Sequence, residues 1–288
     1  MAIESLCALM EAGENQDLCD IIIHSDCVDR GVTKEASFEK MRALYAAIRR
    51  ARAGYDPALR SASGMVGGDG AKMRAYVQSG KTICGDYIGQ VIAQALEMGE
   101  SNACMKCIVA APTAGSCGVL PAVLLPYQAR EGLDDNTMVR AMYVAGAIGQ
   151  VVAAKASIAG AAGGCQAEIG TASAMGAAAL CYLGGGDAQA VCHAAAIAIK
   201  SMLGLVCDPI AGLVEVPCVK RNAAGAMIAM SSADMALAGI RSAVPPDEVI
   251  LAMREVGDKM DVSLKETGIG GVAGTPFGQK IAEKMEMG

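Results

Sequence analysis

Four glycine-rich segments, each followed by an apolar stretch, constrain the fold of this chain more than any other feature. They are SASGMVGGDG at 61–70, APTAGSCG at 111–118, AGAAGGC at 159–165 and ETGIGGVAGTP at 266–276. The stretches that follow have helical patterns, and we predict helices at 71–79, 119–130, 166–183 and 277–285. Small side chains let helices pack closely, so tightly packed helices joined by glycine loops are expected.

The rest of the sequence also favours helices. Aromatic residues make up 3% of the chain and Trp is absent, whereas a β-sandwich would need more Val, Thr, Tyr and Trp. Apolar residues recur at helical spacing from Ile3 to Met10, Leu18 to Val28 and Phe38 to Ile48. We predict a compact all-α fold with an N-terminal helical subregion at 1–60 and the main domain at 61–288. No Pro/Ser-rich linker separates them, so one continuous domain is expected.

Length and charge exclude several classes of protein. A chain of 288 residues, 53% of them hydrophobic, can bury a large core, which excludes intrinsic disorder. The net charge of −6 argues against nucleic-acid binding. The chain opens without a signal-peptide pattern, so its 12 Cys residues are expected in a reducing cytoplasm rather than in disulfides.

Residues 141–164 approach the length of a membrane-spanning helix. Gln150 and Lys155 interrupt this run, and a spanning helix needs about 20 predominantly apolar residues with few or no charges. We therefore predict a buried core helix here and no membrane contact.

The 111–118 loop has the features of an anion site. A glycine loop that leads into a helix presents free backbone N–H groups and the positive end of the helix dipole. Thr113 and Ser116, with the amides around Gly115 and Gly118, could therefore hold a substrate carboxylate. Tight turns between packed helices explain the same glycines equally well. Neither a Walker A nor a Rossmann glycine motif is present, which disfavours a nucleotide.

The cysteines fall into distinct groups. Cys165, Cys207 and Cys218 lie in turns punctuated by Gly or Pro, where a backbone can approach an inorganic cluster. These three suggest an iron–sulfur cluster, with core filling as the alternative. The C-x-x-C pair at Cys104 and Cys107 is expected on a helical stretch and lacks a second pair at zinc spacing. The cysteines expected to fill the core within helical apolar patterns are Cys7, Cys19, Cys27, Cys181 and Cys192.

Three cysteine ligands leave one iron of a four-iron cluster without a protein ligand. Such an iron is a Lewis acid that could bind a substrate hydroxyl and carboxylate and stabilise a leaving hydroxide. Dehydration is the reaction class that suits such a site.

Several strings of this sequence carry a family resemblance. IVAAPTAGSCGVLPAVL, GGCQAEIGTASAMGAAAL, GLVCDPIAGLVEVPCVKRNAAGA and LKETGIGGVAGTP resemble the alpha chain of iron–sulfur-dependent L-serine dehydratase. The resemblance covers roughly residues 60–280. It implies a 4Fe–4S cluster on Cys165, Cys207 and Cys218, and conversion of L-serine to pyruvate and ammonia. It also implies an all-helical catalytic domain whose glycine-rich loops surround the cluster, which assigns that domain to 61–288.

The resemblance also bears on partners. Single-chain members of the family carry a Ser-His-Thr-x-Gly-Pro-Met motif whose His is a candidate base. This sequence has no such motif, and its two histidines, His24 and His193, lie in helical patterns where a lone His is more often a satisfied core residue. We therefore expect a separate beta chain to complete the active site.

The sequence does not identify which residue removes the Cα proton of the substrate. Candidates by residue type alone are Lys200, Glu215, Lys220 and Lys265. Ser61 and Ser63, in the first glycine loop, are further candidate substrate contacts.

The sequence also leaves alternatives for the role of Cys117 and for the reaction that the chain catalyses. Cys117, in the 111–118 loop, could be a neighbour of the cluster, a fourth ligand or a packing residue. The chain could belong to a related cluster enzyme that eliminates sulfide from L-cysteine. It could instead be a helical subunit that binds a cluster or zinc without turnover.

Overall fold

The computed structural model describes residues 3–287 and confirms the all-α fold class, with no β-strand in that range. One π-helical turn spans Gln166–Gly170, and two 3₁₀ turns, η2 and η3, span Ile210–Gly212 and Val262–Leu264. The α-helices are α1 (Leu6–Ala12), α2 (Leu18–Arg30), α3 (Lys34–Ala53), α4 (Asp69–Gln78), α5 (Gly85–Ala103), α6 (Val119–Glu131), α7 (Asp135–Lys155), α8 (Gly160–Gly163), α9 (Thr171–Leu183), α10 (Ala188–Met202), α11 (Cys218–Leu237), α12 (Pro246–Lys259) and α13 (Pro276–Glu286).

The predicted helices after the glycine loops are present with small shifts at their ends. Helices α4, α6 and α13 begin within two residues of the predicted starts. The stretch predicted as one helix over 166–183 opens with the π turn and continues as α9. Short π segments inside helices are rare and often lie at functional sites. Sequence periodicity does not distinguish such a turn from an α-helix.

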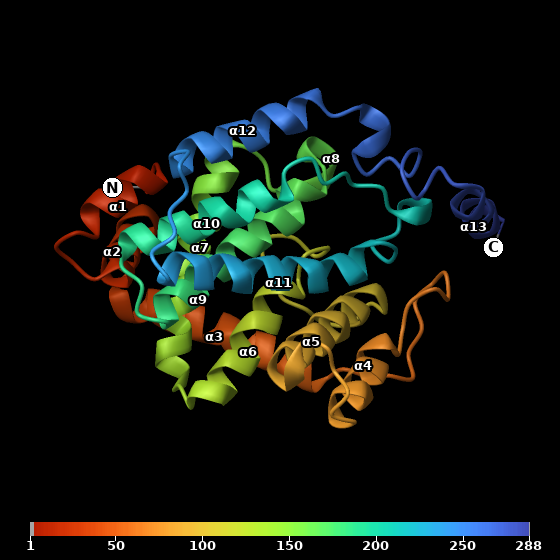
Figure 1. Cartoon of the computed structure of the whole chain (residues 1–288), viewed down its shortest axis with the longest axis horizontal. Coiled ribbons are helices and arrows are strands. Elements are labelled where there is room, and N and C mark those ends of the chain that lie inside the picture. Colours follow the sequence, from red (N-terminus) through yellow and green to blue (C-terminus); the bar gives the residue numbers. More distant parts are fainter. Residues whose placement is uncertain (1–2, 288) are drawn as a thin grey trace.

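Helix α9 is the centre of the fold. It packs against α7, α10 and α11, while α12 lies along one side of this group and α5 and α6 lie on the other (Figure 1). Every residue of α9 from Thr171 to Cys181 is buried. Helix α13 stands at the far end of the molecule and packs against the η2 turn (Figure 1).

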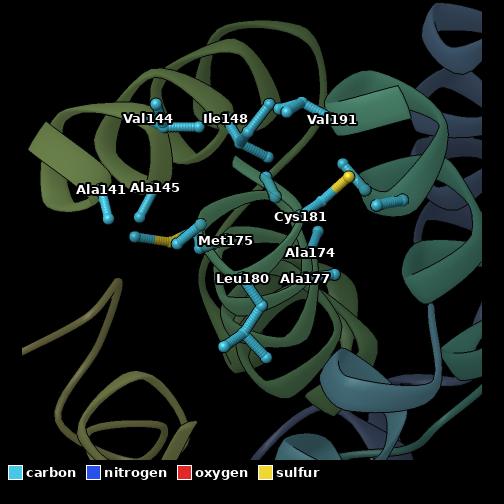
Figure 2. Packing of buried hydrophobic residues seen from close by; sticks show 14 of the residues in the cluster. Ala141, Val144, Ala145, Ile148, Ala174, Met175, Ala177, Leu180, Cys181 and Val191 are labelled. Atoms are coloured by element: carbon cyan, nitrogen blue, oxygen red, sulfur yellow. The ribbon is translucent and has the colours of Figure 1, made fainter. Parts of the chain in front are cut away.

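Small residues set the distances between these helices. In Figure 2, Met175 of α9 points toward Ala141 and Ala145 of α7, which leave room for its side chain. On α11, a Cβ added to Gly225 would lie 2.7 Å from the Ile169 Cγ2 atom and 3.0 Å from Val119 Cγ2. The alanine- and glycine-rich pattern therefore works as predicted, because it lets helix backbones approach closely.

Helix α7 is the segment whose length and apolarity would suit a membrane span. Within its most apolar window, 67% of the residues are buried inside the protein. Val144, Ile148 and Val151 are fully buried. The prediction of a core helix is confirmed for Asp135–Lys155, and the run ends there because Ser157 to Ala159 leave the helix.

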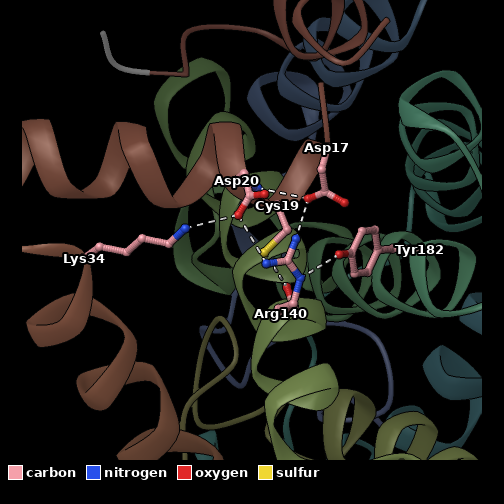
Figure 3. A network of polar contacts seen from close by, with 6 residues as sticks. All are labelled: Asp17, Cys19, Asp20, Lys34, Arg140 and Tyr182. Carbon is pink, nitrogen blue, oxygen red and sulfur yellow. Dashed lines mark hydrogen bonds and ion pairs between the residues drawn. The ribbon is translucent and has the colours of Figure 1, made fainter. Parts of the chain in front are cut away.

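The N-terminal helices share the main core. Leu6 of α1 and Tyr45 of α3 belong to the same buried cluster as Ile148. The Arg140 side chain on α7 reaches Asp17 at 2.5 Å and Asp20 at 3.2 Å on the N-terminal side of the molecule (Figure 3). The division into 1–60 and 61–288 stays a prediction.

The C-x-x-C pair does not lie on a helix, which corrects the sequence-based expectation. Helix α5 ends at Ala103, and Cys107 is exposed beyond it. The reason is a Schellman-type ending: Met105 adopts a left-handed conformation with φ 60°, its N–H donates to Asn102 O, and Lys106 N–H donates to Ser101 O.

Substituting Gly225 by Ala should destabilise the protein by about 1–3 kcal/mol, because the new methyl group would overpack against branched side chains. Denaturant unfolding followed by far-UV circular dichroism measures the change.

The matched control is Gly146→Ala on α7. A Cβ added to Gly146 would meet no other atom within 4 Å, so this variant should gain about 0.5–1 kcal/mol from helix propensity. Equal effects of the two substitutions would contradict close packing at Gly225.

Candidate active site

The 111–118 loop is held in place by the side chain of Asn222 on α11. The Asn222 Oδ1 atom accepts the Gly118 N–H at 2.8 Å, and Nδ2 donates to the carbonyls of Gly115 at 2.8 Å and Cys218 at 3.0 Å. Asn222 is 1% exposed. One buried carboxamide therefore joins the loop to the beginning of α11.

Gly118 has to be a glycine for this arrangement. A Cβ there would lie 2.7 Å from the Ala95 carbonyl oxygen and 2.9 Å from Asn222 Oδ1. The loop was predicted from its glycines, but its partner on α11 was not, because Asn222 lies about a hundred residues away in an ordinary helical pattern.

The two hydroxyl residues of the loop face each other. Thr113 Oγ1 and Ser116 Oγ are 3.0 Å apart, and the Thr113 N–H donates to Ser116 Oγ at 3.3 Å. Ser116 is fully buried. The backbone N–H groups of Ala114, Gly115 and Ser116 find no acceptor within residues 3–287. Consecutive backbone N–H groups without an internal acceptor are donors of the kind that can bind an anion.

Cys165, Cys207 and Cys218 come from three different elements and lie close together. Cys165 precedes the π turn, Cys207 lies in the segment after α10, and Cys218 is the first residue of α11. All three are buried, at 2%, 2% and 7% exposure. Burial raises the pKa of Cys165 to about 11 and of Cys218 to about 12, and it raises the pKa of Cys207 as well. Charge on Cys165 also raises the pKa of Cys207 and of Cys218, and charge on Cys218 raises the pKa of Cys207.

The 266–276 loop packs alongside Cys207. The Cys207 N–H donates to the Leu264 carbonyl at 2.8 Å, and the Glu266 N–H donates back to the Cys207 carbonyl at 2.6 Å. Next in the chain, Asp208 accepts the Val272 N–H at 2.8 Å and forms an ion pair with Arg221 at 2.8 Å. Three glycine-rich segments thus meet around the cysteines.

Glu168 is the residue of this region that sequence reasoning missed. It lies in the π turn, and its Oε2 atom is 3.9 Å from Cys207 Sγ. A Cβ on Gly115 would lie 3.5 Å from both of its carboxylate oxygens. Burial raises the pKa of Glu168, and a hydrogen bond from Thr113 opposes that shift. The available signal was a carboxylate three residues after Cys165 in an otherwise apolar segment.

The Glu168 carboxyl group has no cationic side chain paired with it among the described residues. Its carboxylate takes part in none of the ion pairs found within residues 3–287, and Glu266 raises its pKa further. Arg221, the nearby cation, is paired with Asp208. Glu168 is therefore a buried carboxyl group without an ion-pair partner among the described residues.

The hydroxyl groups of Ser61 and Ser63 both donate hydrogen bonds to a carboxylate of the same chain, that of Glu215. Ser61 Oγ donates to Glu215 Oε2 at 2.6 Å, and Ser63 Oγ donates to the same oxygen. Glu215 is 4% exposed and lies just before Cys218 in the chain. The serines therefore anchor the 61–70 loop to the segment that carries Cys218.

The remaining candidate residues lie in different surroundings. The Lys220 side chain is 74% exposed and pairs with Asp69 at 3.4 Å, and His193 Nδ1 accepts the Ser242 N–H at 3.2 Å. Lys265 forms an isolated backbone bridge with Cys207, while Lys200 is half-buried on α10 and His24 is exposed on α2.

Cys117 behaves as a packing residue. It is fully buried, its Sγ donates to the Met98 carbonyl at 3.7 Å, and burial raises its pKa to about 12. Cys19 and Cys192 make the same kind of contact with a backbone carbonyl. By contrast, hydrogen bonds from the Arg221 guanidinium and the Ile169 N–H favour the thiolate form of Cys165 and lower its pKa against the effect of burial.

Cys165, Cys207 and Cys218 are three sulfur donors supplied by separate segments, and thiolates are the usual ligands of iron–sulfur clusters. Among residues 3–287, no three His, Cys, Asp or Glu side chains are grouped closely enough to hold a single metal ion. Gly160 packs closely against Cys207 and Glu168, since a Cβ there would lie 2.8 Å from both Cys207 Sγ and Glu168 Oε2.

Comparison with known proteins identifies relatives along most of the chain. A family model described as serine dehydratase alpha chain matches residues 5–273. The probable L-serine dehydratase alpha chain of Bacillus subtilis is 47% identical over 272 residues, which are 93% of this chain and 89% of the relative. The L-serine dehydratase alpha chain of Peptoniphilus asaccharolyticus is 51% identical over 217 residues, 75% of this chain and 74% of the relative. An L-serine dehydratase of Streptomyces coelicolor is 44% identical over 181 residues, 62% of this chain but only 40% of the relative.

Replacing Asn222 by Ala should destabilise the protein by about 1–3 kcal/mol, because buried partners in the loop and at Cys218 lose their hydrogen bonds. Thermal and denaturant unfolding measure the loss.

Asn136→Ala is the control, since Asn136 is exposed and accepts one hydrogen bond from Arg42. Its effect should stay within about 0.5 kcal/mol. An Asn222→Ala variant as stable as this control would mean that the carboxamide does not hold the loop.

Proposed function

Because this chain belongs to the serine dehydratase alpha chain family, we propose that it is the alpha subunit of an enzyme that converts L-serine to pyruvate and ammonia. The observation that carries the proposal is the position of Glu168, between the free N–H groups of the 111–118 loop and Cys207. The same family membership supports a cytoplasmic enzyme completed by a beta chain.

The proposed cofactor is a 4Fe–4S cluster on Cys165, Cys207 and Cys218. Support comes from three buried thiols on separate elements, and from the Arg221 guanidinium, whose hydrogen bond favours the thiolate form of Cys165. When bound, such a cluster offers one iron without a protein ligand, which acts as a Lewis acid on the hydroxyl group of the substrate.

The 111–118 loop is proposed to bind the substrate carboxylate. The N–H groups of Ala114, Gly115 and Ser116 have no acceptor among the described residues, and the Thr113 hydroxyl lies in the same loop. The positive end of the α6 dipole adds to the attraction for an anion. Asn222 holds the loop that carries these donors in a fixed position against α11, so the donors need little reorganisation when the substrate binds.

Glu168 is proposed to accept a hydrogen bond from the substrate ammonium group. An α-amino acid carries its carboxylate and its ammonium group on the same carbon. The loop N–H groups suit the carboxylate, and the Glu168 carboxyl group, which lies close to Gly115 in space, suits the ammonium group. The ammonium would supply positive charge that the buried carboxylate lacks. Binding at both groups would fix the orientation of Cα and of the hydroxyl.

Ser61 and Ser63 take a supporting role in this proposal. Both hydroxyls donate to Glu215 and thereby hold the segment before Cys218 in place. They position a cysteine rather than contact L-serine directly.

Substituting Cys207 by Ala should abolish iron and sulfide binding together with serine turnover. Anaerobically purified protein, combined with its beta chain, is analysed for iron, sulfide and pyruvate release from L-serine. Wild type should contain about four irons and four sulfides.

Cys84→Ala is the matched control because Cys84 is exposed and lies outside the cysteine group. It should keep both metal and activity. A Cys207→Ala variant that retains its cluster would refute the ligand assignment, and pyruvate release by the wild-type alpha chain alone would refute the need for a beta chain.

Substituting Glu168 by Gln should leave the iron content unchanged and raise KM for L-serine by about tenfold or more, because a charged hydrogen bond to the ammonium is weakened. Steady-state pyruvate assays at a fixed iron content give both kcat and KM.

A lower kcat at unchanged KM would instead assign Glu168 to proton transfer, for which losses of about 10²- to 10⁴-fold are usual. Exposed Glu283→Gln on α13 serves as the control and should change neither constant.

A further inference from the structure

A hollow lined by arginines lies among α3, α4, α5 and α6. Its volume is about 370 Å³, which falls within the range of small-molecule sites. Its polar lining consists of Arg49, Arg52, Arg74, Gln90 and Gln94, and no Asp or Glu of the described chain lines it. A neighbouring hollow of about 440 Å³ shares Arg52 and Arg74 with it.

The arginines differ in how far their charge is compensated. Arg74 forms a bidentate pair with Glu97 at 2.6 Å, and Arg49 pairs with Asp135 at 2.7 Å. No ion pair within residues 3–287 includes Arg52, whose Nε donates to the neutral Gln94 Oε1 at 3.1 Å. Arg52 therefore brings an uncompensated positive charge to the hollow.

Gln94 provides a second and independent observation. Its side chain lines the hollow, is 3% exposed, and has an Nε2 group with no hydrogen-bond partner within the described residues. The contact from Arg52 Nε fixes the amide orientation, because rotating the amide would bring two donors together. A buried amide donor without an acceptor is uncommon in folded proteins.

We propose that this hollow binds a small molecule through an oxyanion group, either a carboxylate or a phosphate. The oxyanion would accept hydrogen bonds from Arg52 and from the Gln94 amide, which is buried beside Arg52 and would turn toward the bound anion. The guanidinium fork suits both kinds of oxyanion. Leu125 and Pro126 on α6 form an apolar wall for the rest of the ligand.

This site is separate from the cysteine group in its residues and does not depend on the proposed reaction. Its lining comes from α3, α4, α5 and α6, whereas the cysteines come from the segments around the π turn, Cys207 and the start of α11. Binding can therefore be measured without any assay of turnover.

The test is isothermal titration calorimetry of the full chain with inorganic phosphate and, separately, with malonate, both at constant ionic strength in chloride. At least one probe should bind saturably with Kd at or below about 1 mM. Binding of phosphate only would indicate a phosphate site, and binding of malonate only would indicate a carboxylate site. If both bind, the lower Kd identifies the preferred oxyanion.

Arg52→Gln and Gln94→Leu should each weaken binding by about tenfold or more, because each removes a donor to the anion. The control is Arg50→Gln, which makes the same charge change on the same helix outside the hollow and should alter Kd by less than about twofold. Circular dichroism verifies that each variant is folded.

Three results would overturn the proposal. The first is no saturable binding of either probe to wild type. The second is equal weakening by Arg50→Gln and Arg52→Gln, which would indicate diffuse attraction to α3. The third is loss of binding when the beta chain is added. That result would mean that an acidic side chain of the beta chain fills the hollow in place of a small molecule.

Discussion

The carboxamide of Asn222 is the interaction on which the geometry of the candidate site depends. Its two ends hold Gly118 and Gly115 of the loop, and the same nitrogen binds the carbonyl of Cys218. The 111–118 loop and the backbone of Cys218 are therefore fixed by one side chain. Because that side chain is buried, water cannot replace the bonds that its loss would break.

Close helix packing provides the rigid frame for this contact. Small residues bring α9 close to α7 at the centre of the protein (Figure 2), and Gly225 lets α11 approach the same region. Gly118 and Gly225 have no space for even one methyl group. The small residues that join the core helices also let the loop backbone reach the site, so packing and site geometry share one cause.

Two regions of the molecule carry opposite charge imbalances. Around Glu168, thiols and carboxyl groups are buried beside Arg221, whose guanidinium is shared between Asp208 and Cys165. Around Gln94, arginine and amide donors line a hollow without an acidic residue from the described chain. The proposed ligands match these imbalances, because the first region is proposed to bind cationic groups and the second an oxyanion.

The all-α class and most helix positions followed from sequence, because apolar periodicity and glycine loops are local properties. The motifs also singled out Cys165, Cys207 and Cys218, and the structure brings these residues together. Sequence could not identify Asn222, Glu168 or the partner of Ser61, because each acts on residues distant in the chain. The ending of α5 at Met105 was also missed, since a left-handed residue has no periodic signal. Sequence by itself thus determined the helices and the chemical types of the site residues. Tertiary structure decided which donors face which acids, because hydrogen bonding and burial depend on contacts between distant segments.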